Sequence, residues 1–378
     1  MKNKLLLSSA LVGSLVISGA AIAQTTITGD ANLSYRSNSN KGTVSKDIND
    51  SGFGRETQIN IQNKGSLPLA GLSYAAGFSL EFDGQTQAHT TTSSATDGVR
   101  ISNENVFIDI ISGNTTFSVG SDHLPNMSYS AVPRVAQHMG TTLNQAQLTH
   151  TTQPTGTGVD AGTSYQFYPG TNMGSSKGMG IGVMQKTAIG TLVGQYFPQA
   201  DAVAAANDST IRQDSTWGYE VTFRGDLGVK GLTAYVGRNF AEKNASLSDA
   251  KGTAYGLAYN FGQFSIGAGE TKTENGKAAV DNTNKIDIKS REYGATYAVT
   301  KDITVGYNRV ETTGVHGDGA TLALSGASMT NKETAEAVTL GYNLGPITTS
   351  LTWAQLRDAR GVSGNDTDIA LVRAGVKF

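Results

Sequence analysis

Seven charged residues stand where apolar and polar side chains alternate along the chain, and these are the residues best placed to do chemistry. They are Asp30, Arg36, Glu81, Glu220, Arg224, Glu292 and Arg373. In an alternating segment, side chains two residues apart lie on one face of an extended strand, so each charge belongs to a polar face. If that face borders water, fixed charges of both signs attract and repel dissolved ions.

Known catalytic motifs are absent from the sequence. The chain has no His-Glu-x-x-His metal-ligand pair, no Gly-Lys-Ser/Thr phosphate loop and no cysteine. A membrane-embedded hydrolase with a Ser–His pair is the enzymatic alternative. All five histidines fall in segments that we expect to be loops, where solvated side chains are the commoner case: His89, His123, His138, His150 and His316. We therefore expect a protein that is not an enzyme and has neither a cofactor nor a metal site.

Two acidic loops offer oxygen ligands of the kind that hard cations prefer. Residues 38–51 contain Asp47 and Asp50, and residues 201–214 contain three further aspartates. Their spacing matches no calcium-binding loop. We expect these residues to be solvated loop acids.

Amphipathic strands are the elements that position the charged residues. Ala370, Val372, Ala374, Val376 and Phe378 put an apolar side chain at every second position. This pattern predicts a strand with one apolar face at the end of the chain. The same alternation recurs at residues 72–82 and 217–224, and aromatic residues gather near strand ends, as they do at membrane interfaces.

Short turns alternate with long polar loops along the chain. Short turns are predicted at 63–70, 112–114, 188–190, 225–231 and 300–302, and around Gly262 and Gly345. Long loops are predicted at 37–54, 83–102, 121–177, 198–213, 241–251, 273–285, 313–332 and 357–365. Seven turns and eight loops connect sixteen strands. The pattern predicts an all-β fold, a transmembrane antiparallel β-barrel with short periplasmic turns and long external loops, because a soluble sandwich has no reason to make every second connection long.

Residues 161–197 allow two assignments. The sixth strand can lie at 161–168, with 179–197 as one long seventh strand, or the sixth and seventh strands can form a hairpin that turns at 188–190. Both assignments keep sixteen strands. We favour the hairpin because it repeats the unit found elsewhere, and this choice places 161–177 in the third loop.

Composition agrees with an exported barrel. The 378 residues include 46 Gly, 7 Pro and 38% apolar residues, and the mean hydropathy of −0.24 is far below that of a membrane helix bundle. Residues 1–23 have the form of a signal peptide, with Lys2 and Lys4, an apolar run, and small residues up to Ala23. We expect residues 24–378 to form one barrel. The net charge of −2 gives no support for nucleic-acid binding, and the lack of cysteine excludes a disulfide scaffold.

On these features the chain resembles the Gram-negative general porins, particularly those typical of alpha- and betaproteobacteria. The resemblance rests on the exported N-terminus with residues 26–35, on Phe117-Ser118-Val119-Gly120 before the longest loop, and on the strand that ends at Phe378. It implies a homotrimer of sixteen-stranded barrels in the outer membrane, each with its third loop folded into the pore. It also implies passive diffusion of small hydrophilic solutes and ions, contact with outer-membrane lipid and lipopolysaccharide, and no nucleic-acid partner.

The third loop departs from the charge pattern that the resemblance implies. Many such porins set loop acids against basic residues on the wall, whereas residues 121–177 contain only two acids and two bases, apart from histidine. The residues that we expect to line the pore and set its selectivity are Arg373, Asp30, Arg36, Glu81, Glu220, Glu292, Asp122 and Arg134. We expect Arg224, next to a periplasmic turn, to be structural.

One other function remains open on the sequence, and a second is not favoured. A substrate-selective channel would show saturable conductance for one class of solute. An autotransporter or adhesin also ends in a Phe-terminated barrel, but strands begin by about residue 26 and leave no passenger domain.

Closure of the barrel sets the first strand beside the last, so we expect Asp30 and Arg373 to lie at similar height and to brace the closing seam.

Overall fold

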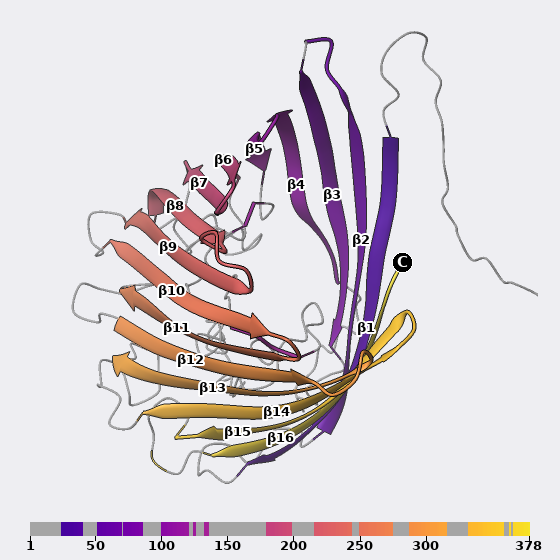
Figure 1. Ribbon diagram of the computed structural model, residues 1–378, viewed down its shortest axis with the longest axis vertical. Coiled ribbons are helices and arrows are strands. Elements are labelled where there is room, and N and C mark those ends of the chain that lie inside the picture. The colour runs from indigo at the N-terminus through magenta and orange to yellow at the C-terminus, as the bar shows by residue number, and fades with distance from the viewer. Residues whose placement is uncertain are drawn as a thin grey trace, which may run out of the picture.

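Sixteen antiparallel strands form one closed barrel in the part of the chain that the structure describes. The structure is a computed structural model and describes residues 24–40, 51–69, 71–85, 100–120, 124–125, 132–135, 179–198, 215–243, 249–274, 287–315, 332–358, 363 and 366–378. Each strand pairs with its neighbours in sequence, and β1 also pairs with β16 (Figure 1). The predicted strand count is confirmed. The proposed signal peptide lies outside the described residues.

The strands vary in length around the wall. Their bounds are β1 Gln24–Asn40, β2 Ser51–Ser66, β3 Leu72–Gln85, β4 Arg100–Ser112, β5 Thr115–Gly120, β6 Gly180–Thr187, β7 Gly190–Phe197, β8 Ser215–Gly225, β9 Leu232–Lys243, β10 Ala250–Phe261, β11 Phe264–Glu274, β12 Asp287–Ala298, β13 Ile303–Val315, β14 Glu333–Leu344, β15 Ile347–Arg357 and β16 Thr367–Lys377. The described part of the chain contains no helix long and apolar enough to cross a membrane.

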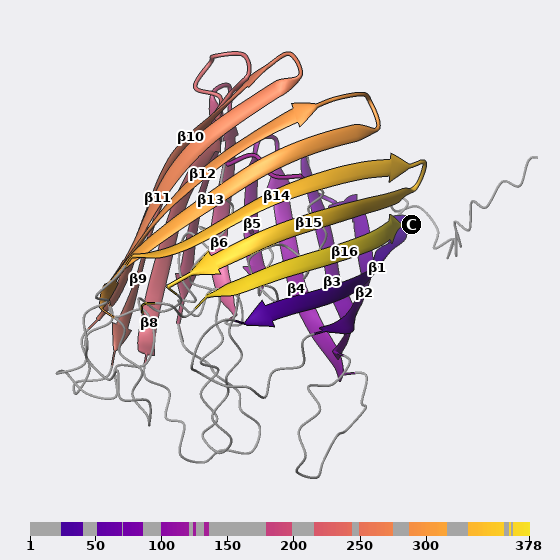
Figure 2. The same ribbon diagram turned by 90° about the horizontal axis from the view of Figure 1, so that it is seen from below.

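The alternation of short and long connections is confirmed. All seven predicted short turns fall between consecutive strands, and β6 and β7 form the favoured hairpin around residues 188–189. The turns that join β10 to β11, β12 to β13 and β14 to β15 lie at one end of the barrel (Figure 2). Left-handed backbone at Gly113, Gly262 and Gly345 closes three of the seven turns, with φ of 56°, 64° and 63°, a conformation that glycine adopts without steric cost.

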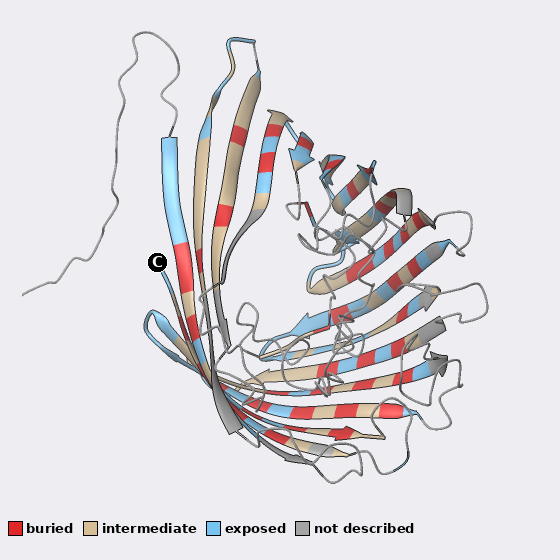
Figure 3. Cartoon of the chain, turned by 180° about the vertical axis from the view of Figure 1, so that it is seen from behind, coloured by how far each residue is buried: buried red, intermediate tan, exposed pale blue. Residues whose placement is uncertain are grey.

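Burial alternates along most strands, because successive side chains point to opposite faces of the wall (Figure 3). The outward positions carry large exposed apolar side chains, among them Leu33, Ile108, Val119, Leu340 and Val372. Outward aromatic rings stack across neighbouring strands, as in Phe264 on β11 with Tyr297 on β12, whose centroids are 4.5 Å apart. Such an exterior suits lipid.

β1 and β16 close the barrel, and the pair at the end of their ladder joins Gly29 to Phe378. The amide of Gly29 donates to the carbonyl of Phe378 at 2.8 Å, and the amide of Phe378 donates back at 2.9 Å. The Phe378 ring lies over Gly29, where an added Cβ would be 2.7 Å from Cζ. The terminal aromatic residue therefore covers a residue of β1 that leaves room for it.

The expected height match of Asp30 and Arg373 is wrong. Asp30 stands opposite Lys377, and Arg373 stands opposite Ser34, an offset of four residues or about 13 Å along the strand. The first strand starts below the end of the last one because tilted strands close into a barrel only with a stagger. Asp30 and Arg373 therefore do not brace each other.

The last strand is apolar on both faces near its loop end, which the prediction of a single apolar face missed. Ile369 and Leu371 lie on the same face as Arg373 and are each 2% exposed. Ile369 belongs to an inward cluster that β13–β16 form with Val310, Ala335, Ala337, Ala354 and Leu356. Polar and apolar residues do not alternate here, because the inward side chains pack against one another away from water.

The topology predicts which connections are outside the cell. Protease sites inserted at Asn207 and Gly326, which lie outside the described residues, should be cut in intact cells. A site at Asp302, in the turn between β12 and β13, should be cut only after the outer membrane is permeabilised. Gel analysis of the fragments distinguishes the cases, and cleavage at Asp302 in intact cells with protection of the other two would invert the barrel.

Candidate functional site

The inner wall of the barrel is lined by polar residues that are almost fully buried. On alternate positions opposite the apolar exterior lie Asp30, Asn32, Gln58, Asp109, Glu220, Asn239, Glu292, Asn308 and Arg373, each no more than 6% exposed. A hydrophilic inner face on an apolar cylinder is the arrangement expected of an aqueous passage. The low exposure shows that these side chains pack closely with their neighbours on the wall.

The third loop begins by packing against the inner wall at β6–β8. It follows β5, and Leu124, which is buried, contacts the inward side of Gly182. The carbonyl oxygen of Pro125 accepts hydrogen bonds from Gln195 at 3.5 Å and from Thr222 at 3.4 Å. The chain therefore turns into the barrel directly after β5.

Residues 132–135 of the same loop pack on another part of the inner wall, at β11–β13. Asn308 donates a hydrogen bond to the carbonyl oxygen of Pro133 at 3.0 Å, and Val132 is 2% exposed. The described parts of the third loop therefore contact the inner wall at β6–β8 and again at β11–β13. The expectation of an inward third loop is thus supported by its described parts.

Glycines on the inner wall make room for this loop. A Cβ added at Gly294 would lie 2.5 Å from Val132 and 2.6 Å from the oxygen of Pro133. At Gly267 an added Cβ would lie 2.8 Å from the Pro133 ring, and at Gly306 it would lie 2.5 Å from Val135. Close approach of another backbone is a common reason for glycine inside a strand. We call Gly267, Gly294 and Gly306 the glycine seat.

An ion pair fastens the loop beside the glycine seat. Arg134 donates from Nη2 to Glu292 on β12, and the two side chains are 10% and 7% exposed. Removing one partner of such a buried pair costs about 3–5 kcal/mol, because the other charge is left in a poorly solvated place. Both residues were predicted to line the pore, and the structure brings them together.

The remaining predicted residues lie apart from this pair. Glu220 on β8 stands opposite Gln195 and Asn239, and Glu81 on β3 stands opposite Gln58. Both are on the inward side of strands whose other face is apolar. They can add acidic charge to the wall.

Asp30 and Arg373 occupy different levels of the closing seam. Asp30 accepts a hydrogen bond from Asn32 at 2.7 Å, whereas Arg373 faces inward between Ser34 and Ser350. Arg36 belongs to β1 opposite Leu371 and Gly52, but its side chain is outside the description. Asp122 lies outside the described residues.

Sequence reasoning missed Asp109, Asn308 and the glycine seat. Asp109 is 6% exposed and alternates with Ile108 and Ile110 on β4, so the period-two signal was present. The glycine seat gave a weaker signal, because a glycine in a strand can also mark a bend or a bulge. Among the described residues, no three histidine or acidic side chains are grouped as a metal site.

A closed antiparallel barrel with an apolar exterior, a polar interior and parts of a loop packed on its inner wall defines a channel-forming outer-membrane protein. The chain belongs to the family of Gram-negative porins, whose family model matches residues 8–378. It is a multi-pass protein of the outer membrane, and it serves passive diffusion of small hydrophilic solutes and ions.

Solved porin structures share the fold at low sequence identity. An anion-selective porin from Comamonas acidovorans has a TM-score of 0.59 and 13% identity, over 94% of this chain and 100% of that chain. An engineered tryptophan mutant of the Rh. blastica porin has a TM-score of 0.55 with the same identity and coverage. No curated protein sequence matches the chain.

The glycine seat predicts a specific effect on conductance. Gly294→Ala should push residues 132–135 about 1 Å toward the channel axis, because a Cβ needs ordinary van der Waals distance from the loop. Single-channel conductance in planar bilayers should therefore fall. Gly194→Ala on β7 is the matched control, because an added Cβ there meets nothing within 4 Å. Equal conductance in both variants and the wild type would mean that residues 132–135 do not border the ion path.

Proposed function

We propose that residues 132–135 and the inner wall of β11–β13 form the constriction of this diffusion channel. The observation that carries the proposal is the Arg134–Glu292 ion pair, which fastens the loop to the wall from inside the barrel. A sixteen-stranded barrel is otherwise wide enough to leave an open aqueous channel. The position of the loop then decides which solutes fit.

The charges on the wall support a weak preference for cations. Glu292 is balanced by Arg134 and Asp30 stands opposite Lys377, which leaves Glu81, Asp109 and Glu220 against Arg373 among the described inward residues near mid-wall. The Comamonas porin is described as anion-selective, so the shared fold leaves the sign of selectivity open and the side chains decide it. Arg36 and Asp122 complete the proposed set of pore-lining residues.

The assembly that we propose is a homotrimer in contact with outer-membrane lipid and lipopolysaccharide. Support comes from the outer face of β1–β5, whose described side chains are uncharged and include Leu33, Phe78 and Phe117. A face of this kind can pack against a second copy. We further propose that residues 1–23 are a removed signal peptide, that residues 24–378 form the barrel, and that the protein has no catalytic activity and no nucleic-acid partner.

Single-channel recording of the purified protein in planar bilayers tests the function. The current should rise with potassium chloride concentration without saturating, and the reversal potential in a salt gradient should show a weak cation preference. Saturation by one class of solute, with inhibition of the ion current, would instead establish the substrate-selective alternative.

The ion pair predicts opposite effects of its two partners. Arg134→Gln should raise cation preference, because the charge of Glu292 is no longer balanced, and Glu292→Gln should move preference toward anions. The double variant should return close to the wild-type reversal potential while its current noise stays raised, because the loop is untethered in all three. Lys301→Gln, in a turn with its side chain 90% exposed, is the control. Wild-type reversal potentials in both single variants would remove the pair from the ion path.

Because Asp30 and Arg373 lie at different levels of the β1–β16 seam, we expect their substitutions to have additive effects on ion selectivity. Arg373→Ala should raise cation preference and Asp30→Asn should lower it, and the double variant should show the sum, because groups more than about 7–10 Å apart act independently. Reversal potentials in a potassium chloride gradient measure this. A double variant that departs strongly from the sum would show that the two charges interact after all.

A further inference from the structure

Charged residues follow directly above a belt of aromatic side chains on the outer face of β10–β14. Tyr255, Tyr293 and Tyr307 are outward and exposed. The next outward positions toward the loops are Arg291 on β12 and Arg309 on β13, and Glu270 on β11 is the register partner of Tyr255. Tyrosine belts mark the level where hydrocarbon meets headgroups. The charged rows therefore lie at headgroup level on the side of the long external loops.

The first cluster is centred on Glu270. Its carboxylate accepts from Lys289 at 2.9 Å and from Nε of Arg291 at 3.0 Å, and its other oxygen accepts from the Tyr255 hydroxyl at 2.8 Å. Glu270 and Arg291 stand in direct register on β11 and β12. The bond through Nε leaves the terminal Nη groups of Arg291 able to donate to another acceptor.

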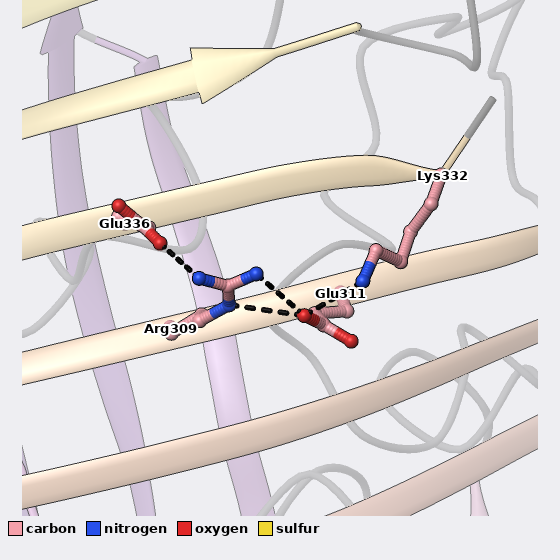
Figure 4. A network of polar contacts seen from close by, with 4 residues as sticks. All are labelled: Arg309, Glu311, Lys332 and Glu336. Atoms are coloured by element: carbon pink, nitrogen blue, oxygen red, sulfur yellow. Dashed lines mark hydrogen bonds and ion pairs between the residues drawn. The ribbon is translucent and has the colours of Figure 1, made fainter.

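The second cluster is centred on Glu311 (Figure 4). Glu311 accepts from Nη2 of Arg309 at 2.6 Å and from Lys332 at 2.8 Å, and Arg309 also donates to Glu336 on β14. The two clusters are neighbours, because Arg291 on β12 is the register partner of Glu311 on β13.

In both clusters the basic side chains are more exposed than the central acid that holds them, and Glu336 at the edge of the second cluster is about as exposed as Arg309, at 33%. Glu270 and Glu311 are 19% and 17% exposed, whereas Lys289, Arg291, Arg309 and Lys332 are 40%, 53%, 36% and 44% exposed. We call these four basic residues the outer basic strip. The carboxylates orient the strip from below, and the surface that it presents to the membrane is cationic.

We propose that the outer basic strip binds the phosphate groups of lipopolysaccharide in the outer leaflet. This inference rests on the contact with lipopolysaccharide proposed above, and it assigns that contact to the outer basic strip. Arginine and lysine at headgroup level recognise phosphate through charge-assisted hydrogen bonds, while the apolar and aromatic wall below the strip contacts acyl chains. The outer face of β1–β5 carries no charged side chain among its described positions, so the lipid binds on one side of the barrel.

Binding of purified diphosphorylated lipid A to the full-length protein in detergent, followed by native mass spectrometry, tests the inference. Lys289→Gln with Lys332→Gln should weaken binding by about tenfold or more, since a basic residue at an anionic membrane surface contributes about 1 kcal/mol. Both arginines stay in place, so the arginine ion pairs to Glu270 and Glu311 are kept while the lysine ion pairs are lost. Arg291→Gln alone should weaken binding in the same direction.

The matched control is Lys64→Gln with Lys301→Gln, which removes two exposed lysines at the opposite end of the barrel and should leave binding unchanged. Lipid A stripped of phosphate should bind the wild type at least about tenfold more weakly. Equal lipid A binding by the two double variants, or complete displacement by equimolar inorganic phosphate, would overturn the inference. Single-channel conductance should be unchanged in both double variants, so failure here is separable from failure of the proposed channel function.

Discussion

Every backbone amide and carbonyl inside the hydrocarbon layer must find its hydrogen bond within the protein, since lipid offers none. For strands this requirement allows only a sheet without edges, and the pairing of β1 with β16, from Asn40 to Gly29, removes the last edge. The tilt and stagger of the strands follow, because a sheet closes only when its ends are displaced. That displacement places Asp30 against Lys377 and separates it from Arg373. A requirement on the backbone thus fixes which charges can meet in the lumen.

Closure also creates the problem that the third loop solves. A cylinder of sixteen strands is too wide for wall side chains to fill, so selectivity needs polypeptide inside it. The wall receives that polypeptide at Gly267, Gly294 and Gly306, where side chains are missing, and holds it with Glu292 and Asn308. The wall thus attaches the loop in two ways, since its glycines leave space for the loop and Glu292 supplies a buried charge that holds it. On the exterior, single acids also hold several groups, because Glu270 and Glu311 each orient two basic side chains.

Local pattern was enough to predict the strands, the turns and the strand count, because side-chain alternation and turn chemistry act over a few residues. The hairpin at residues 188–189 followed from the same signals. The register across the seam could not be predicted, since stagger is a property of the whole cylinder. The Arg134–Glu292 pair joins residues 158 apart, and nothing local links them. Alternation misled at Ile369 and Leu371, where the inward face is covered and therefore apolar.

The seam differs from every other strand pair in the distance along the chain that it spans. All other pairs join strands that are consecutive in sequence. Most of them can form as local hairpins soon after their residues are available, whereas β5 and β6 pair across the long third loop. The contact between Gly29 and Phe378 has the longest loop to close. Until it forms, β1 and β16 both present open edges that can pair with other chains. A chain that lacks β16 keeps such an edge permanently. Only a completely synthesised chain can therefore close the barrel.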